Sequence, residues 1–377
     1  MVADLTALVA LDTQNPGGEG EEKAARLIAA DLSAAGYATT LVPIAPGRAN
    51  VVATLVNGEG PTLAFNTHMD VVPVGGGWSS PPLALRQADG KLYGRGACDA
   101  KGQLVAMMEA LRMLAADRSA WRGTVCGVFV ADEEVGSAGA RHFAATGAKV
   151  DYAVIGEPTS NAVVIAHKGS MRPIVRVAGV SAHSASPDLG SNAIYNAARL
   201  IPRFAALHHE IVQRAPHGML GCGSLTLTRA NGGTADNMVP DRMELMLDRR
   251  LVPGESDEAA IAEIEAVLTA ARADGVDAVI DRFAPTTGGA TETPPDHPIV
   301  AAARAASERH GVRAAAPGGF QGGCDLVHFN AMGATGVVIG PGDIAVAHKP
   351  DEFVPIDELA TAPLIYRDLA TAMLPVP

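Results

Sequence analysis

The chain has 377 residues, of which 48% are hydrophobic and 19% charged, and its formal net charge is −12. A chain of this length is longer than a domain with a single hydrophobic core usually is, so the length predicts two domains. The composition excludes a disordered chain. The acidic balance, with Lys and Arg scattered rather than clustered, argues against a nucleic-acid partner.

The N-terminal segment has no features of an export signal. Asp4 lies where such a signal would carry positive charge, and no apolar run approaches the roughly 18 residues of a membrane span. Four cysteines lie far apart and form no CxxC pair, which is typical of reduced thiols. We therefore predict a cytoplasmic protein with no membrane partner.

Helix and strand patterns alternate along the first part of the chain. Residues 21–35 show helical apolar spacing and end at Gly36, a favourable helix C-cap. A second helix is predicted over 102–116. Buried strands are predicted at residues 51–56, 62–67, 124–130 and 152–156. This alternation predicts a three-layer α/β/α domain.

A different order of elements follows residue 157. Strand, helix, strand, strand, helix and strand are predicted over residues 171–180, 192–209, 224–229, 242–251, 257–272 and 276–283. This βαββαβ order is that of a ferredoxin-like α+β domain. A helix over 298–309 and a strand over 336–340 then resume the α/β pattern. We expect one domain from residues 1–170 and 285–377, with residues 171–284 inserted as the second.

Acidic and histidine side chains follow the ends of several predicted strands, at the edge where open α/β sheets collect ligands. His68 and Asp70 follow the strand at 62–67. Glu133 and Glu134 follow the strand at 124–130, and Glu157 follows the strand at 152–156. Any one of these residues alone is typical of a solvated turn.

Two further candidates lie at the same predicted edge. Asp99 precedes the helix at 102–116, and His348 follows a Gly-Pro-Gly turn after the strand at 336–340. Together with the preceding residues they supply two imidazoles and several carboxylates, which are ligands suited to zinc, cobalt or manganese. The convergence of these side chains predicts a metal centre.

Spacing also suggests how these residues divide their roles. His68 and Asp70 are two apart, so in extended backbone they share a face, and Asp70 is expected to accept the second ring N–H of His68. Glu133 and Glu134 are adjacent, so in an extended segment they would point to opposite sides. That arrangement suits one glutamate as a metal ligand and its neighbour as a free base.

Six motifs in one order resemble the M20 metallopeptidase family, which includes acetylornithine deacetylase, succinyl-diaminopimelate desuccinylase, aminoacylases and glutamate carboxypeptidase. The motifs are 68–73 (HMDVVP), 92–102 (LYGRGACDAKG), 132–137 (DEEVGS), 156–159 (GEPT), 179–184 (GVSAHS) and 347–352 (AHKPDE). The similarity spans nearly the whole chain. Ala100 departs from the family, whose members often carry Met or Asp there.

The resemblance implies a zinc-peptidase-like catalytic domain with two divalent metal ions, zinc first and cobalt or manganese as alternatives. His68 and Glu157 would hold one ion. Glu134 and His348 would hold the other, and Asp99 would bridge the two.

The resemblance further implies that Glu133 is the general base and that the inserted domain is the lid and dimerisation domain of a homodimer. His183 would reach into the active site of the other subunit and help to bind the tetrahedral oxyanion. Asn237 and Arg250 match positions that contact the substrate. Residues 318–325 resemble the substrate-binding loop in outline, which makes Gly323 a third expected contact.

Segments 132–136, 167–169 and 340–345 are most similar to acetylornithine deacetylase, so the expected substrate is an N-acyl-L-amino acid. A desuccinylase and a carboxypeptidase or dipeptidase stay open, because all share the same metal chemistry. A non-catalytic binding protein on this scaffold would be expected to lack the base or a ligand, whereas this sequence carries all of them. A phosphohydrolase would be expected to carry a glycine-rich phosphate cradle or a basic cluster, and we find neither.

Overall fold

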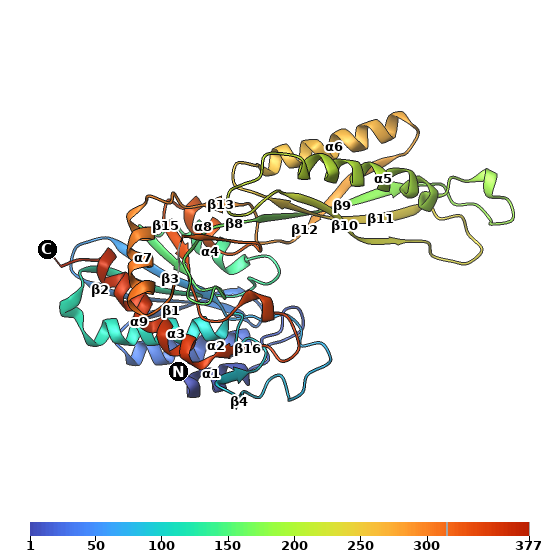
Figure 1. Ribbon diagram of the computed structural model, residues 1–377. Helices are drawn as coiled ribbons and strands as arrows, with labels where there is room; N and C mark the ends of the chain where they lie inside the picture. The colour runs from blue at the N-terminus through green and yellow to red at the C-terminus, as the bar shows by residue number, and fades with distance from the viewer. Residues whose placement is uncertain (314–315, 377) are drawn as a thin grey trace. The chain divides into compact units, whose positions relative to one another are not determined.

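The computed structural model describes residues 1–313 and 316–376 (Figure 1). The chain divides into two compact units by its internal contacts. The first unit comprises Met1–Ile165, Glu292–Gly319 and Cys324–Pro377, and the second comprises Ala166–Thr291 and Phe320–Gly323. Among the described residues, no helix has both the length and the apolar composition needed to cross a membrane.

A nine-stranded mixed sheet forms the centre of the first unit. Its order is β1-β2-β6-β3-β7-β15-β8-β13, and β14 pairs with β8. The strands are β1 (Ala38–Ala45), β2 (Arg48–Asn57), β3 (Thr62–His68), β6 (Gly123–Val130), β7 (Tyr152–Ile155), β8 (Val164–His167), β13 (Thr291–Glu292), β14 (Gly318–Phe320) and β15 (Thr335–Val338). The central strands β6, β3, β7 and β15 run parallel, and β1 and β2 are antiparallel at one edge.

Helices lie on both faces of this sheet, which confirms the three-layer α/β/α arrangement (Figure 1). They are α1 (Val2–Val9), α2 (Glu21–Ala34), α3 (Lys101–Ala116), α4 (Ala138–Ala145), α7 (Pro298–Arg309), α8 (Leu326–Ala331) and α9 (Ile356–Met373). Helix α3 packs on β3, β6 and α9, while α8 packs on β7, β15 and α4. Strands β3 and β6 are therefore buried along almost their whole length, as apolar strands with two covered faces should be.

A small antiparallel sheet accompanies the first unit and was not predicted. It has the order β16-β5-β4 and consists of β4 (Arg86–Ala88), β5 (Lys91–Tyr93) and β16 (Phe353–Pro355). Strands of three residues are too short to show a period of two in the sequence. This sheet pairs the segment before Asp99 with the segment after His348.

The second unit confirms the predicted ferredoxin-like insert. Its elements are β9 (Gly169–Ala178), α5 (Ala193–Val212), β10 (Ser224–Gly232), β11 (Arg242–Leu251), α6 (Asp257–Ala273) and β12 (Ala278–Ala284). The sheet order is β10-β11-β9-β12, antiparallel throughout. Leu200, Phe204 and Ile264 of the helices pack with Val175 and Leu245 of the strands in one core.

The segment that follows β6 is tied to β2 by a buried asparagine. The Asn50 side-chain amide donates to the Gly139 carbonyl at 2.8 Å, and its Oδ1 accepts the Ala131 N–H at 3.1 Å. Gly139 leaves no room for a side chain, because a Cβ there would lie 2.4 Å from the Asn50 Oδ1 and 2.6 Å from the Ala131 carbonyl oxygen.

Gly139→Ala is expected to destabilise the first unit by about 1–3 kcal/mol, because the added methyl group must displace backbone atoms. Thermal unfolding should show a melting temperature lowered by several degrees. Gly76→Ala is the matched control, since a Cβ at Gly76 would meet no atom within 4 Å. Equal melting temperatures for the two variants would contradict the close packing at Gly139.

Candidate metal centre

The ends of the parallel strands bring the predicted ligands to one edge of the first unit. His68 is the last residue of β3, Glu134 follows β6 and Glu157 follows β7. Asp99 lies two residues before α3, and His348 lies in the connection between β15 and β16. His68, Asp99 and Glu157 are buried, whereas the side chain of His348 is half-exposed.

The carboxylate of Asp99 lies between the two imidazoles. Its Oδ1 is 3.2 Å from the Nε2 of His68, and its Oδ2 is 3.1 Å from the Nε2 of His348. The same Nε2 of His348 is 3.2 Å from Oε2 of Glu134. Ligand atoms of His68, Asp99 and Glu134 all lie within 4.8 Å of one another. One carboxylate with an oxygen toward each ring is the geometry that a bridging ligand requires.

Buried negative charge accumulates around these rings. Burial raises the pKa of Glu157 well above its usual value, the charge of Asp99 raises it further, and His68 opposes the shift. Burial likewise raises the pKa of Glu133, with His68 opposing and Glu157 adding to the rise. Like charges held together away from water need a compensating cation.

The residues present fit a divalent cation. Glu134 has one buried carboxylate oxygen, Oε1, without a hydrogen-bond partner among the described residues. Imidazole nitrogens and carboxylate oxygens are the ligands that zinc, cobalt and manganese accept. The candidate site therefore has both the donor types and the excess negative charge that such an ion neutralises.

Proton binding at the two histidines is linked to metal binding. Hydrogen bonds with Asp99 and Glu134 raise the pKa of His348 to about 10. Burial works against a charge on His68, but the Asp70 and Asp99 carboxylates outweigh it and raise the pKa of His68. Only an unprotonated nitrogen binds a metal, so a metal ion held by these rings would compete with their protons.

The acceptor for the second ring nitrogen of His68 differs from the prediction. The Nδ1–H of His68 donates to the main-chain carbonyl of Asp70 at 2.9 Å, whereas the Asp70 carboxylate is 3.5 Å away. Strand β3 ends at His68, so Asp70 no longer shares a strand face with it. The carboxylate of Asp70 instead accepts the backbone N–H groups of Glu133 at 3.1 Å and Glu134 at 3.2 Å.

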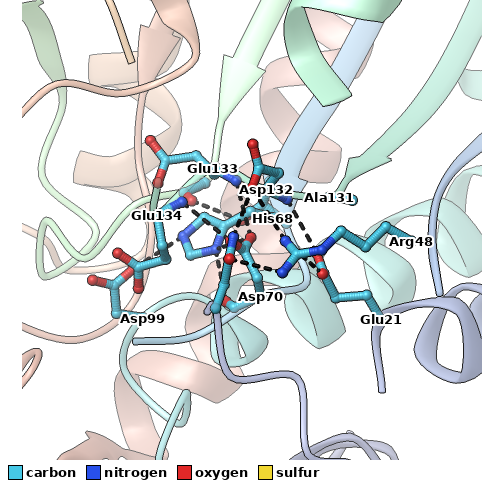
Figure 2. A network of polar contacts seen from close by, with 12 residues as sticks. Glu21, Arg48, His68, Asp70, Asp99, Ala131, Asp132, Glu133 and Glu134 are labelled. Carbon is cyan, nitrogen blue, oxygen red and sulfur yellow. Dashed lines mark hydrogen bonds and ion pairs between the residues drawn. The ribbon is translucent and has the colours of Figure 1, made fainter. Parts of the chain in front are cut away.

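Glu133 and Glu134 lie in a turn, so the expectation of an extended segment is wrong. Asp132 has a left-handed φ of 67°, and its carbonyl accepts the backbone N–H groups of Gly136 and Ser137. The chain therefore reverses directly after β6. The backbone at Glu133 and Glu134 is held by this turn and by the Asp70 contacts, rather than by strand pairing (Figure 2).

A second buried carboxylate holds the loop that carries Asp99. Oε1 of Glu352 accepts the backbone N–H groups of Cys98 at 2.9 Å and Asp99 at 3.1 Å. Its Oε2 is paired with the guanidinium of Arg95, which is also buried. Sequence reasoning did not single out Arg95 or Glu352, although both lie inside the motifs that surround Asp99 and His348.

Asp325 is a further acidic residue that sequence reasoning did not assign to the site. It is buried, and burial raises its pKa to about 6 while the nearby His68 lowers it. Its position as the last residue of the predicted substrate loop, 318–325, was the available signal. This further buried carboxyl group near His68 increases the demand for a compensating cation.

Four predicted substrate and oxyanion residues belong to the second unit. His183 is exposed, and its Nδ1 accepts the backbone N–H of Ala185 at 3.1 Å, so a neutral ring carries its proton on Nε2. The Ser184 N–H donates to the Asn237 carbonyl at 3.0 Å, which places His183 and Asn237 on neighbouring segments. Gly323 packs closely against Thr287, because a Cβ added at Gly323 would lie 3.2 Å from the Thr287 Cβ.

The structure distinguishes the two arginines of the segment 249–250. Arg249 is buried and paired with Glu255. Arg250 is partly exposed, and its Nε donates to the Asp248 carboxylate at 2.6 Å. A guanidinium that is partly exposed and held by one neighbour is the better placed of the two for a carboxylate ligand.

The chain is similar to known proteins over most of its length. The model of "Peptidase family M20/M25/M40" matches residues 64–372. An acetylornithine deacetylase of Vibrio vulnificus is 33% identical over 342 residues, which cover 86% of this chain and 85% of that protein. The acetylornithine deacetylase of Myxococcus xanthus is 32% identical over 371 residues, covering 95% and 93%.

Solved structures share the fold over both units. An M20 family metallo-carboxypeptidase of Sulfolobus solfataricus superposes with a TM-score of 0.81 at 18% identity, covering 99% of this chain and 98% of that one. A dinuclear metal-binding peptidase of the M20 family from Bacillus subtilis has a TM-score of 0.73 at 19% identity, covering 99% of each chain. The protein is thus a metal-dependent hydrolase of amide bonds. The chain belongs to the peptidase family M20/M25/M40.

Proposed function

We propose that the protein hydrolyses the amide bond of an N-acyl-L-amino acid, in the manner of an acetylornithine deacetylase, with two divalent metal ions. The carboxylate of Asp99 between the Nε2 atoms of His68 and His348 is the observation that carries the proposal. The relatives named acetylornithine deacetylase, at 31–33% identity, support this substrate class.

A peptidase activity is the second candidate. Structural neighbours include a metallo-carboxypeptidase, a tripeptidase of Staphylococcus aureus and human carnosine dipeptidase 1. These share the fold at 21% identity or less, so they favour the amide chemistry without choosing the substrate. A desuccinylase stays open for the same reason.

The proposed ligand sets follow the family resemblance. His68 and Glu157 would hold one ion, and Glu134 and His348 would hold the other, with Asp99 between them. Zinc is the first choice, with cobalt or manganese as alternatives. When bound, such ions lower the pKa of a water molecule and polarise the amide carbonyl.

Glu133 is the proposed general base. It takes the proton of the attacking water and later delivers it to the leaving amine. Its burial favours the protonated state that the carboxyl group holds between these two transfers. The N–H contacts from the turn to Asp70 keep the backbone of Glu133 in place during both steps.

The second unit is the proposed lid and dimerisation domain of a homodimer. In this proposal, His183 of the partner subunit donates its Nε2–H to the developing oxyanion, a contribution of about 3 kcal/mol for a well-placed donor. Arg250 would bind the α-carboxylate of the substrate with its planar guanidinium, and Asn237 and Gly323 would line the same pocket. The cytoplasmic location stays a prediction from the sequence.

Glu133→Gln is expected to lower kcat by about 10²–10⁴-fold, because the amide cannot accept the proton of water. Metal content, measured by atomic emission, should equal that of the unaltered protein, since Glu133 is not a ligand. Glu59→Gln, at an exposed position, is the control and should retain full activity. Near-normal turnover of Glu133→Gln would contradict the assignment of the base.

Mixing His183→Ala with Glu133→Ala protein, each inactive alone, should restore part of the activity. A mixed dimer holds one active site with an intact Glu133 that receives His183 of the partner subunit. Subunit exchange is verified by differently tagged chains, and activity is then measured against mixing time. Complete subunit exchange without recovered activity would contradict the role of His183 in the active site of the partner subunit.

A substrate panel separates the proposed deacylase from the peptidases. The metal-free protein is loaded with zinc, cobalt or manganese and assayed on N-acetyl amino acids, N-succinyl amino acids and dipeptides. We expect the highest kcat/KM with N-acetyl substrates and no turnover after a chelator is added. A preference for dipeptides would assign the peptidase instead, and inactivity on every amide would refute the proposal.

A further inference from the structure

A chain of polar contacts connects Arg48 to the turn that carries Glu133. The proposed mechanism assigns no role to these contacts. Arg48, at the start of β2, donates from Nη2 to the side-chain oxygen of Asn15 at 2.7 Å. Its Nη1 lies 3.1 Å from Oδ1 of Asp132 and 2.9 Å from Oε2 of Glu21. Figure 2 shows Arg48 extending toward Asp132 and Glu21.

Asn15 connects this guanidinium to the site. Its side-chain N–H₂ donates to Oδ2 of Asp70 at 2.9 Å and to Oδ1 of Asp132 at 2.8 Å. Asp70 in turn accepts the N–H groups of Glu133 and Glu134. Three consecutive hydrogen bonds therefore lead from Arg48 through Asn15 and Asp70 to the backbone of the proposed base.

Arg48 also holds the first residue of the turn directly. Glu21, which it pairs with, accepts the backbone N–H of Asp132 at 3.1 Å through its other oxygen. Asp132 is the residue with the left-handed φ at which the chain reverses. The guanidinium thus reaches both the start of the turn and, through Asn15, its centre.

The charges in this network explain why a cation is needed. The carboxylates of Asp70 and Glu21 are almost fully buried, and Asp132 is partly buried. Buried carboxylates repel one another unless a cation or donor satisfies them, and removal of one partner from such a network is costly. The planar guanidinium of Arg48 donates to Asn15 and Asp132 and is ion-paired with Glu21 at the same time.

We infer that Arg48 is a positioning residue for Glu133, acting through Asn15 and Asp70 on the turn after β6. This inference rests on the proposed function, because it assigns Arg48 to the step in which Glu133 moves a proton. Among the described residues, the Arg48 side chain makes its polar contacts with Asn15, Glu21 and Asp132, and none of these is a predicted metal ligand or substrate contact. Its loss should therefore slow the chemical step and leave substrate binding intact.

We expect that a free ion can take the place of the Arg48 guanidinium. It lines a surface groove together with residues of α2, β1 and the β1–β2 turn, among them Glu22, Arg26, Leu41 and Gly47. We therefore expect a guanidinium ion from solution to enter this groove when the arginine side chain is truncated. Arg26 lines the same groove, pairs with Glu22 and has a mostly exposed side chain, so it serves as the matched control.

The test compares Arg48→Ala with Arg26→Ala in the metal-loaded enzyme. We expect kcat of Arg48→Ala to fall by about 10–100-fold with KM unchanged, as for other residues that orient a metal site from outside it. Millimolar guanidinium chloride should restore part of kcat, and equal sodium chloride should not. Arg26→Ala should show neither the loss nor the response.

A second comparison separates positioning from general stability. In a Glu133→Gln background, Arg48→Ala should cost little further activity, because the residue it positions is already lost. If Arg48→Ala fails to fold, Arg48→Lys and Asn15→Ala provide the same comparison. An unchanged kcat in Arg48→Ala, or an equal loss in both backgrounds, would overturn the inference. Inactivity of the unaltered enzyme on every amide would instead refute the proposed function.

Discussion

Negative charge gathered in the interior of the first unit is the constraint on which the rest of the site depends. Asp99, Glu133 and Glu157 are all buried beside the ring of His68. Carboxylates in such surroundings are stable only with a cation close by, because the medium screens their repulsion poorly. This packing fits a metal site, and the same carboxylates raise the pKa of His68 and of His348.

Backbone amides, rather than side chains alone, keep these carboxylates in position. Asp70 binds two N–H groups of the turn at Glu133, and Glu352 binds two N–H groups of the loop at Asp99. In both cases a buried carboxylate is joined to an arginine, Arg48 through Asn15 or Arg95 directly. Two loops that follow different strands are thus held in the same way, by a buried carboxylate that accepts two backbone N–H groups and is joined to an arginine.

The predictions from residue pattern succeeded where one segment decides its own structure. The order of strands and helices, the ferredoxin-like insert and the placement of His68 and Glu134 at strand ends all follow from local periodicity. They failed where the backbone leaves the strand. Asp70 and Glu133 lie beyond the ends of β3 and β6. The alternation of side chains between the two faces of a strand therefore applies to neither residue.

Residue pattern and motif spacing were enough to predict the fold class, the order of the elements and the residue types of the candidate metal centre, because periodicity and motif spacing are local properties. The residues that support this centre became visible only in the folded chain. Cys98 and Glu352 are 254 positions apart, and Asn15 and Asp132 are 117 apart. No local pattern links such residues, since their contacts arise only when the sheet and its connecting loops assemble.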